Sequence, residues 1–237
     1  MTYRELVYMA LDALKIHSDD SKFTEDHVIF LLDKYRAYVL QQRYLKSNEG
    51  IHDSNYQVLT INLEKQFVDI PVEEYGGGFK KSLKQIPKVL KIALPKVFDT
   101  REWRQEYTFT SSDRLIYVGH NRFLKNVKYC AIDKNGYLEL KSSQDRIAFI
   151  TEVQMQAVFE NPNEAYDFNE DTLDILDRTF PLEAMLTPSV LELVMKDLTN
   201  GLYKPSDTTN DAQDALSDLA GFLRRNMKSQ FQKQIDE

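Results

Sequence analysis

The residues that come nearest to phosphate chemistry are the glycine run Gly76–Gly78 and the Lys80, Lys81 and Ser82 that follow it. A P-loop requires G-x-x-x-x-G-K-[ST] between a strand and a helix, so that backbone amides and the lysine surround the phosphates. Here no glycine directly precedes a lysine, and Pro87 is unfavourable for a following helix. The sequence therefore predicts no nucleotide site.

The histidines and the cysteine do not indicate a metal site or a nucleophile. The chain has four histidines, at His17, His27, His52 and His120. No two of them have the spacing of a zinc finger or of an H-E-x-x-H helix, so we expect surface or hydrogen-bonding roles. Cys130 is the single cysteine and lies in an apolar, strand-like stretch, which predicts a buried structural thiol. We therefore expect no metal and no cofactor.

Several acids have the residue type needed for acid–base catalysis. They are Asp167, Glu170, Asp171 and Asp174. Closely spaced acids with no basic or aromatic pocket beside them are typical of a solvated face. The pair Asp19 and Asp20 is explained by a turn that leads into a helix. With no convergent acid, base and nucleophile, the sequence predicts a protein that is not an enzyme.

The charges are segregated along the chain. Residues 79–104 carry eight Lys or Arg against two acids, whereas residues 160–177 carry seven acids and no Lys or Arg. Opposite charges on neighbouring copies would favour head-to-tail contacts, which close into rings when the rotation permits. This hypothesis makes the four acids above and four cations interface residues; the cations are Lys80, Lys81, Lys84 and Lys88. Alternatively, the two segments touch within one molecule or face water.

The overall composition is that of an ordinary soluble globular protein. The 237 residues are 42% hydrophobic and 28% charged, with a formal net charge of -7. This charge argues against sequence-specific nucleic-acid binding, which needs phosphate-neutralising cations, but it permits a passive channel for DNA. The lone cysteine excludes an intrachain disulfide and fits a reducing compartment. No signal peptide or membrane span is recognisable, so we expect synthesis inside the cell.

The elements that must position these side chains begin with two helices. Thr2 and Glu5 form a T-x-x-E capping box before an apolar helical stripe, and Thr24 is the expected N-cap of a second helix that runs to about residue 45. The second helix has a face rich in tyrosine and arginine, residue types that are enriched in interface hot spots. This face consists of Tyr35, Arg36, Tyr38 and Arg43.

The middle of the chain is predicted to be rich in β-structure, and helices return after it. Alternation predicts strands over residues 56–70, 115–118 and 147–159, and Asn135-Gly136 predicts a hairpin between 127–132 and 137–141. Further helices are expected over 187–200 and 211–234. The fold class expected from this order is α+β: a helical bundle of residues 1–46 and 162–237, with a β-rich insertion of residues 47–161.

The order of several longer stretches resembles a known family. These stretches are Thr2–Met9, Ser18–Ser21, Phe23–Val28, Ser54–Gln57, Ile86–Pro87, Val118–Phe123, Tyr137–Ser143, Val158–Glu160, Leu176–Glu183 and Pro205–Asp207. Together they are similar to head-to-tail connector (neck ring or adaptor) proteins of crAss-like tailed bacteriophages. The resemblance covers most of the chain in the same order, and its motifs are not enzymatic signatures.

The resemblance implies a virion structural protein. The resemblance implies that copies of the chain form a homo-oligomeric, twelve-fold ring under the portal protein. This ring would contact other neck and tail ring proteins. The chain would be made in the cytoplasm of the bacterial host. Genomic double-stranded DNA would pass through the ring without sequence-specific binding, during retention and ejection. The alternative is a non-enzymatic adaptor that binds a single protein partner through the Tyr/Arg face of the second helix.

Overall fold

The structure is a computed structural model that describes residues 1–17, 23–46, 50–65, 78–100, 106–115, 117–118, 127–142, 147 and 149–199. The chain begins with α1 (Tyr3–His17) and α2 (Glu25–Tyr44). Both predicted starts are confirmed: the Thr2 amide donates to Glu5 Oε2 at 3.0 Å, and Thr24 Oγ1 accepts from the His27 amide at 3.4 Å. The expected final helix over 211–234 and the Asp19–Asp20 turn lie outside the described residues.

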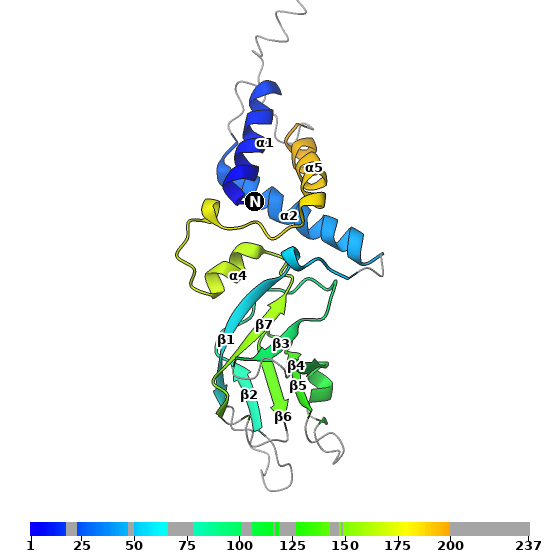
Figure 1. The fold of residues 1–237 in the computed structure, drawn as a ribbon, viewed down its shortest axis with the longest axis vertical. Coiled ribbons are helices and arrows are strands. Elements are labelled where there is room, and N and C mark those ends of the chain that lie inside the picture. Colours follow the sequence, from blue (N-terminus) through cyan, green and yellow to red (C-terminus); the bar gives the residue numbers. More distant parts are fainter. Residues whose placement is uncertain are drawn as a thin grey trace, which may run out of the picture.

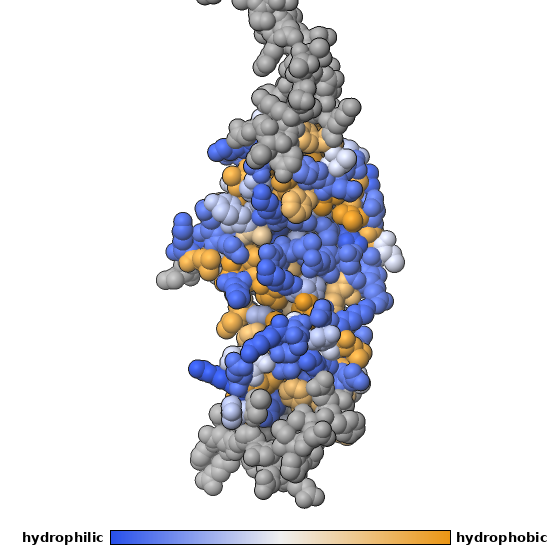
Figure 2. All heavy atoms as spheres, turned by 180° about the vertical axis from the view of Figure 1, so that it is seen from behind, coloured by the Kyte–Doolittle hydropathy of each residue, from blue (hydrophilic) through white to orange (hydrophobic). Residues whose placement is uncertain are grey.

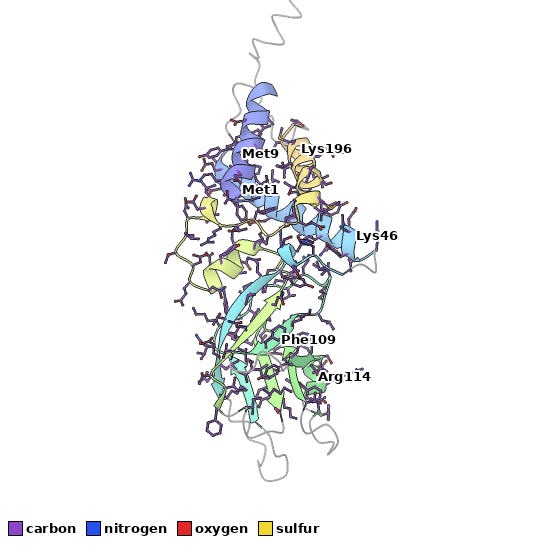
Figure 3. All side chains as sticks on the ribbon, viewed as in Figure 1. Met1, Met9, Lys46, Phe109, Arg114 and Lys196 are labelled. Carbon is purple, nitrogen blue, oxygen red and sulfur yellow. The ribbon has the colours of Figure 1, made fainter. Side chains whose placement is uncertain are left out.

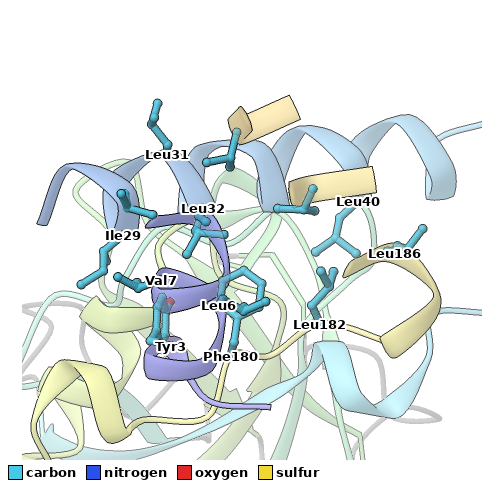
Figure 4. Close-up of a cluster of buried hydrophobic side chains, with 14 of the residues drawn as sticks. Tyr3, Leu6, Val7, Ile29, Leu31, Leu32, Leu40, Phe180, Leu182 and Leu186 are labelled. Atoms are coloured by element: carbon cyan, nitrogen blue, oxygen red, sulfur yellow. The ribbon is translucent and has the colours of Figure 1, made fainter. Parts of the chain in front are cut away.

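A third long helix, α5 (Thr187–Thr199), packs with α1 and α2 at one end of the molecule (Figure 1). Their buried faces meet in one apolar cluster, shown in part in Figure 4. Leu32 and Val194 are fully buried in this cluster, and the ring of Tyr3 meets the ring of Phe180 edge-on with centroids 5.0 Å apart. The three helices therefore share a core that is separate from the sheet.

The other end of the molecule is a closed β-barrel in the order β1-β2-β6-β5-β4-β3-β7 (Figure 1). Its strands are β1 (Gln57–Lys65), β2 (Gly78–Ser82), β3 (Lys96–Asp99), β4 (Glu106–Phe109), β5 (Lys128–Ile132), β6 (Leu138–Ser142) and β7 (Glu152–Ala157). All neighbouring pairs are antiparallel except β4 and β5, which are parallel.

Strict alternation along β1 and β7 fills the barrel with apolar side chains. In the register of this pair, Leu59 lies opposite Met155 and Ile61 lies opposite Val153, and all four side chains are fully buried. A closed barrel of about eight strands has an interior just wide enough for its own side chains. The interior is therefore a packed core.

The fold-class prediction is wrong. The central architecture is a closed seven-stranded barrel that carries a few helices, and it is not a helical bundle with a β-rich insertion. The basic segment, for which the sequence did not predict strands, contributes to β2 and β3 of the barrel. Its short strands are held by neighbours distant in sequence, a kind of pairing that local periodicity does not reveal. The proposed division into two domains stays a prediction.

Short helices cover the barrel wall. α3 (Ser112–Leu115) ends at the first residue of the strand predicted over 115–118, and it buries Leu115 against Tyr129 and Ala131 of β5. Tyr117 and Val118 lie in a turn, so they do not form the predicted strand. α4 (Pro162–Phe168) packs on β1, with Ala165 in the barrel core. The hairpin prediction is confirmed, since β5 and β6 are joined by a turn in which Gly136 has φ +80, a conformation that favours glycine. Single turns of 3-10 helix, η1 (Asp53–Asn55), η4 (Ile175–Asp177) and η5 (Ala184–Leu186), complete the described connections.

Candidate assembly surfaces

Arg36, predicted to lie on an interface, is fully buried where the helices meet the barrel. Its guanidinium donates to three backbone carbonyls: Nε to Pro181 at 2.7 Å, Nη1 to Phe159 at 2.9 Å and Nη2 to Asn55 at 3.3 Å. Asn55 precedes β1, and Phe159 follows β7. Burial lowers the pKa of Arg36 to about 10, so the side chain remains charged at neutral pH. One side chain of α2 thus holds the adjoining ends of two neighbouring strands.

A polar cluster extends this junction toward the end of α2. The buried Asn55 accepts from the Glu183 amide through Oδ1 at 3.0 Å, and Tyr44 donates its hydroxyl to Glu183 Oε1 at 3.1 Å. Arg43, another predicted interface residue, places Nε 3.4 Å from the same carboxylate and keeps 34% of its side chain exposed. Arg43 therefore forms an ion pair within its own chain and leaves part of its side chain exposed to solvent.

Asp33 forms a polar contact that links α2 to α1 and α4, and sequence reasoning missed it. Its carboxylate accepts from the Tyr3 hydroxyl at 2.6 Å and from Asn163 Nδ2, in α4, at 3.1 Å. Burial is the main cause that raises the pKa of Asp33 to about 6, although these hydrogen bonds and Arg36 lower it. Burial also raises the pKa of the Tyr3 hydroxyl, and the nearby Asp33 raises it further.

The two predicted tyrosines of α2 have different surroundings. Tyr35 is half-buried and donates its hydroxyl to Asp197 of α5, which also lies 3.5 Å from Lys34 Nζ. Tyr38 is 48% exposed, and its hydroxyl accepts from Gln42 Nε2 at 2.6 Å. Of the four residues assigned to the Tyr/Arg face, Tyr38 is therefore the one that presents an aromatic ring to solvent.

The predicted basic residues all contact their own chain. Lys80 is buried in the barrel and donates to the carbonyl of Ile150. Lys81 Nζ lies 3.4 Å from Asp133 and 3.6 Å from Glu139, within ion-pair distance. On the outside, Lys84 pairs with Glu170 at 2.7 Å, and Lys88 pairs with Glu160 at 2.5 Å. The basic and acidic segments thus touch within one molecule.

The predicted acids follow α4, and their side chains differ in what they bind. Asp167 pairs at 2.7 Å with Arg178, whose side chain is itself buried. The Lys84 ammonium that pairs with Glu170 lowers the pKa of that carboxyl. Asp171 accepts from the Leu173 amide at 3.1 Å, which shapes the turn. Asp174 is exposed and has no ion pair among the described residues. Whether any of these residues contacts another subunit stays a prediction.

Exposed apolar side chains lie in the acidic segment and near the end of α2, and they were not predicted from the sequence. Leu173 and Ile175, within the acidic segment, are 54% and 39% exposed. Leu45 at the end of α2 is 65% exposed, and Met185 of η5 is 77% exposed. A signal for the first pair is present in the sequence, because two large aliphatic residues interrupt a run of acids.

The described residues include no group suited to metal or thiol chemistry. Within them, no three His, Cys, Asp or Glu side chains gather as they would around a metal ion. Cys130 is fully buried in the barrel core, and burial raises the pKa of its thiol strongly, as the predicted structural role requires. Among the helices of this part of the chain, none is long and apolar enough to cross a membrane.

Comparison with known proteins identifies the family. The chain is 39% identical over 227 residues to ring protein 2 of Bacteroides phage crAss001, an alignment that covers 92% of this chain and 99% of that protein. The family model for phage tail ring protein 2 matches residues 5–218. Both matches extend over the helices and the barrel together. The chain therefore belongs to the phage tail ring protein 2 family of crAss-like phages.

Proposed function

We propose that this chain is a non-enzymatic subunit of a twelve-fold ring in the head-to-tail connector, beneath the portal. The ring continues the channel for genomic double-stranded DNA, retains the genome, allows its ejection and docks the tail. Its partners are further copies of itself, the portal protein and other neck or tail rings. The protein is made in the host cytoplasm and acts in the virion. Membership of the ring protein 2 family supports this proposal.

The packed barrel interior is the observation that fits this function best. Leu59, Leu140 and Met155 are fully buried inside the barrel, so the interior of this barrel leaves no room for a DNA duplex. The channel must instead be the space that several copies enclose. An elongated subunit, with helices at one end and the barrel at the other, suits such packing around an axis (Figure 1).

The charge of the chain suits a passive channel. Each copy carries a formal net charge of -7, so the ring as a whole repels phosphates rather than binding them. Duplex DNA held by many cationic contacts would move slowly, whereas a weakly interacting wall lets it slide during packaging and ejection. This argument favours a channel over a DNA-binding platform.

A symmetry-resolved reconstruction of the virion neck, with this chain traced in the density, tests the proposal. We expect a closed ring of copies next to the portal, with the DNA axis through its centre. A chain that is absent from the neck, or that is present as isolated copies bound to one partner, would contradict the connector function.

A further inference from the structure

A closed ring requires two different surfaces on each subunit, because the contact is heterologous and repeats head to tail. The following inference deepens the proposed function and depends on it, since it assigns those two surfaces. Lys84 and Lys88 of the basic segment are paired with acids of their own chain, which leaves other residues to contact the neighbour. Two other exposed regions of the described structure each combine apolar side chains with charge.

The first region, here called the acidic flank, comprises residues 160–177. Its seven acids are opposed by four cations of the same chain, Arg4, Lys84, Lys88 and Arg178. Among the described residues the other three acids, Glu164, Asp171 and Asp174, have no ion pair, so the flank keeps an excess of negative charge. Leu173 and Ile175 project apolar surface between these acids.

The second region, here called the α2 flank, comprises Tyr38–Lys46 together with Met185. Tyr38–Lys46 contains two cations, Arg43 and Lys46, and no acid. Lys46 is exposed and has no ion pair within the described part of the chain. Tyr38, Leu45 and Met185 are large side chains that are 48%, 65% and 77% exposed. Seen from behind, the edge where α2 ends has hydrophobic residues beside hydrophilic ones (Figure 2).

The two flanks lie on opposite sides of the molecule. In Figure 1, α4 and the segment that follows it form one edge, and the end of α2 forms the other. Figure 3 labels Lys46 at that second edge. The flanks have opposite charge, and each carries exposed apolar side chains. Opposite positions are what a head-to-tail contact needs, because the two flanks of one chain cannot meet each other.

We propose that the α2 flank of one copy binds the acidic flank of the next copy in the ring. Leu45 and Met185 pack against Leu173 and Ile175 of the neighbour, and Lys46 faces the excess carboxylates. The apolar contacts supply most of the affinity, because burial of apolar surface is the dominant favourable term in most protein–protein association. The charges select the orientation and speed association.

Carbodiimide cross-linking of purified virions, followed by peptide mass spectrometry, tests the assignment. This reagent joins an amine directly to a carboxylate. We expect a ladder of cross-linked multimers and peptides that couple Lys46 to Asp171 or Asp174, a link that the two opposite flanks of one chain cannot make. The intrachain pair Lys84–Glu170, 2.7 Å apart, is the internal positive control.

The outcomes separate this inference from the proposed function. A ladder whose cross-links join other surfaces would overturn the pairing of flanks and leave the ring intact. A virion sample with the control cross-link and no ladder would contradict the ring itself, and the inference with it.

Two variants provide an independent test in solution, at concentrations where the wild-type protein assembles. Leu45→Asp damages the α2 flank and Leu173→Lys damages the acidic flank. Each is expected to weaken self-association about thirtyfold. Mixed together, they should give a heterodimer that does not grow, because one intact flank remains on each. Phe149→Asp is the matched control, at a residue 72% exposed between β6 and β7, and should assemble normally. Normal assembly of both flank variants would refute the assignment.

Discussion

Replacing Arg36 by methionine should destabilise the protein more than any change to a surface arginine. Methionine fills much of the same volume but donates no hydrogen bond. Three buried carbonyls, of Asn55, Phe159 and Pro181, would lose their partner. An orphaned buried acceptor costs about 1–3 kcal/mol, and partial entry of water reduces the sum, so we expect a loss of about 4 kcal/mol.

Urea unfolding followed by circular dichroism measures this loss. With a slope of about 2 kcal/mol per molar urea, the midpoint of Arg36→Met should fall by about 2 M. Arg4→Met is the matched control. It removes a pair with Asp177 at 2.9 Å in which both side chains are about half exposed, and such solvent-screened pairs contribute little to stability. Arg36→Lys keeps the charge with fewer directed donors and should lie between the two.

An Arg36→Met variant that unfolds within about 1 kcal/mol of the Arg4→Met variant would refute this reasoning. Such a result would mean that water or a rearranged neighbour satisfies the three carbonyls without loss. The guanidinium would then not be what joins α2 to the barrel.

Three further predictions concern the buried groups. Because the folded pKa of Asp33 is about 6 against a reference of 3.8, its contribution to stability is present below pH 4 and is lost as pH rises through 6. The wild type should therefore gain about 2 kcal/mol relative to Asp33→Asn between pH 7.5 and pH 4, and a constant difference would contradict the burial of this carboxyl. Met155→Ala should cost about 2–5 kcal/mol in urea unfolding, whereas Val58→Ala, on the exposed face of the same strand pair, should cost about 0.5 kcal/mol; equal losses would contradict the assigned barrel interior. Cys130 should react with a thiol reagent at pH 8 only after unfolding, and rapid labelling of the native protein would contradict its burial.

The local elements could be predicted from the sequence because their signals are local. Thr2 with Glu5 and Thr24 mark helix starts through side chains within one turn, and Asn135-Gly136 marks the β5–β6 turn. Closure of the barrel depends instead on the short strands β2, β3 and β4, of which β2 pairs with the distant β6 and β3 with the distant β7. A strand of that length is held by its neighbours, so its own pattern is weak.

Two of the predicted interface residues, Arg36 and Lys80, are buried although their charge suggested exposure. Leu32, Arg36 and Leu40 recur every four residues and are all buried, so Arg36 lies on the apolar stripe of α2. That spacing was a usable signal. The burial of Lys80 follows from the alternation of side chains along β2. Lys80 and Ser82 alternate with Lys81 and face the interior. A lysine or arginine side chain can be buried where backbone carbonyls accept its hydrogen bonds, and no local sequence pattern shows where those carbonyls lie.

The contacts of Arg36 also have a mechanical meaning. The carbonyls that it holds belong to the entry of β1 and the exit of β7, two strands that pair along the length of the barrel. A tilt of α2 must therefore drag both strand ends at once, and the barrel wall between them resists shear. Arg36 thereby couples the helical end to the barrel, so torque applied to one end of the molecule is transmitted to the other.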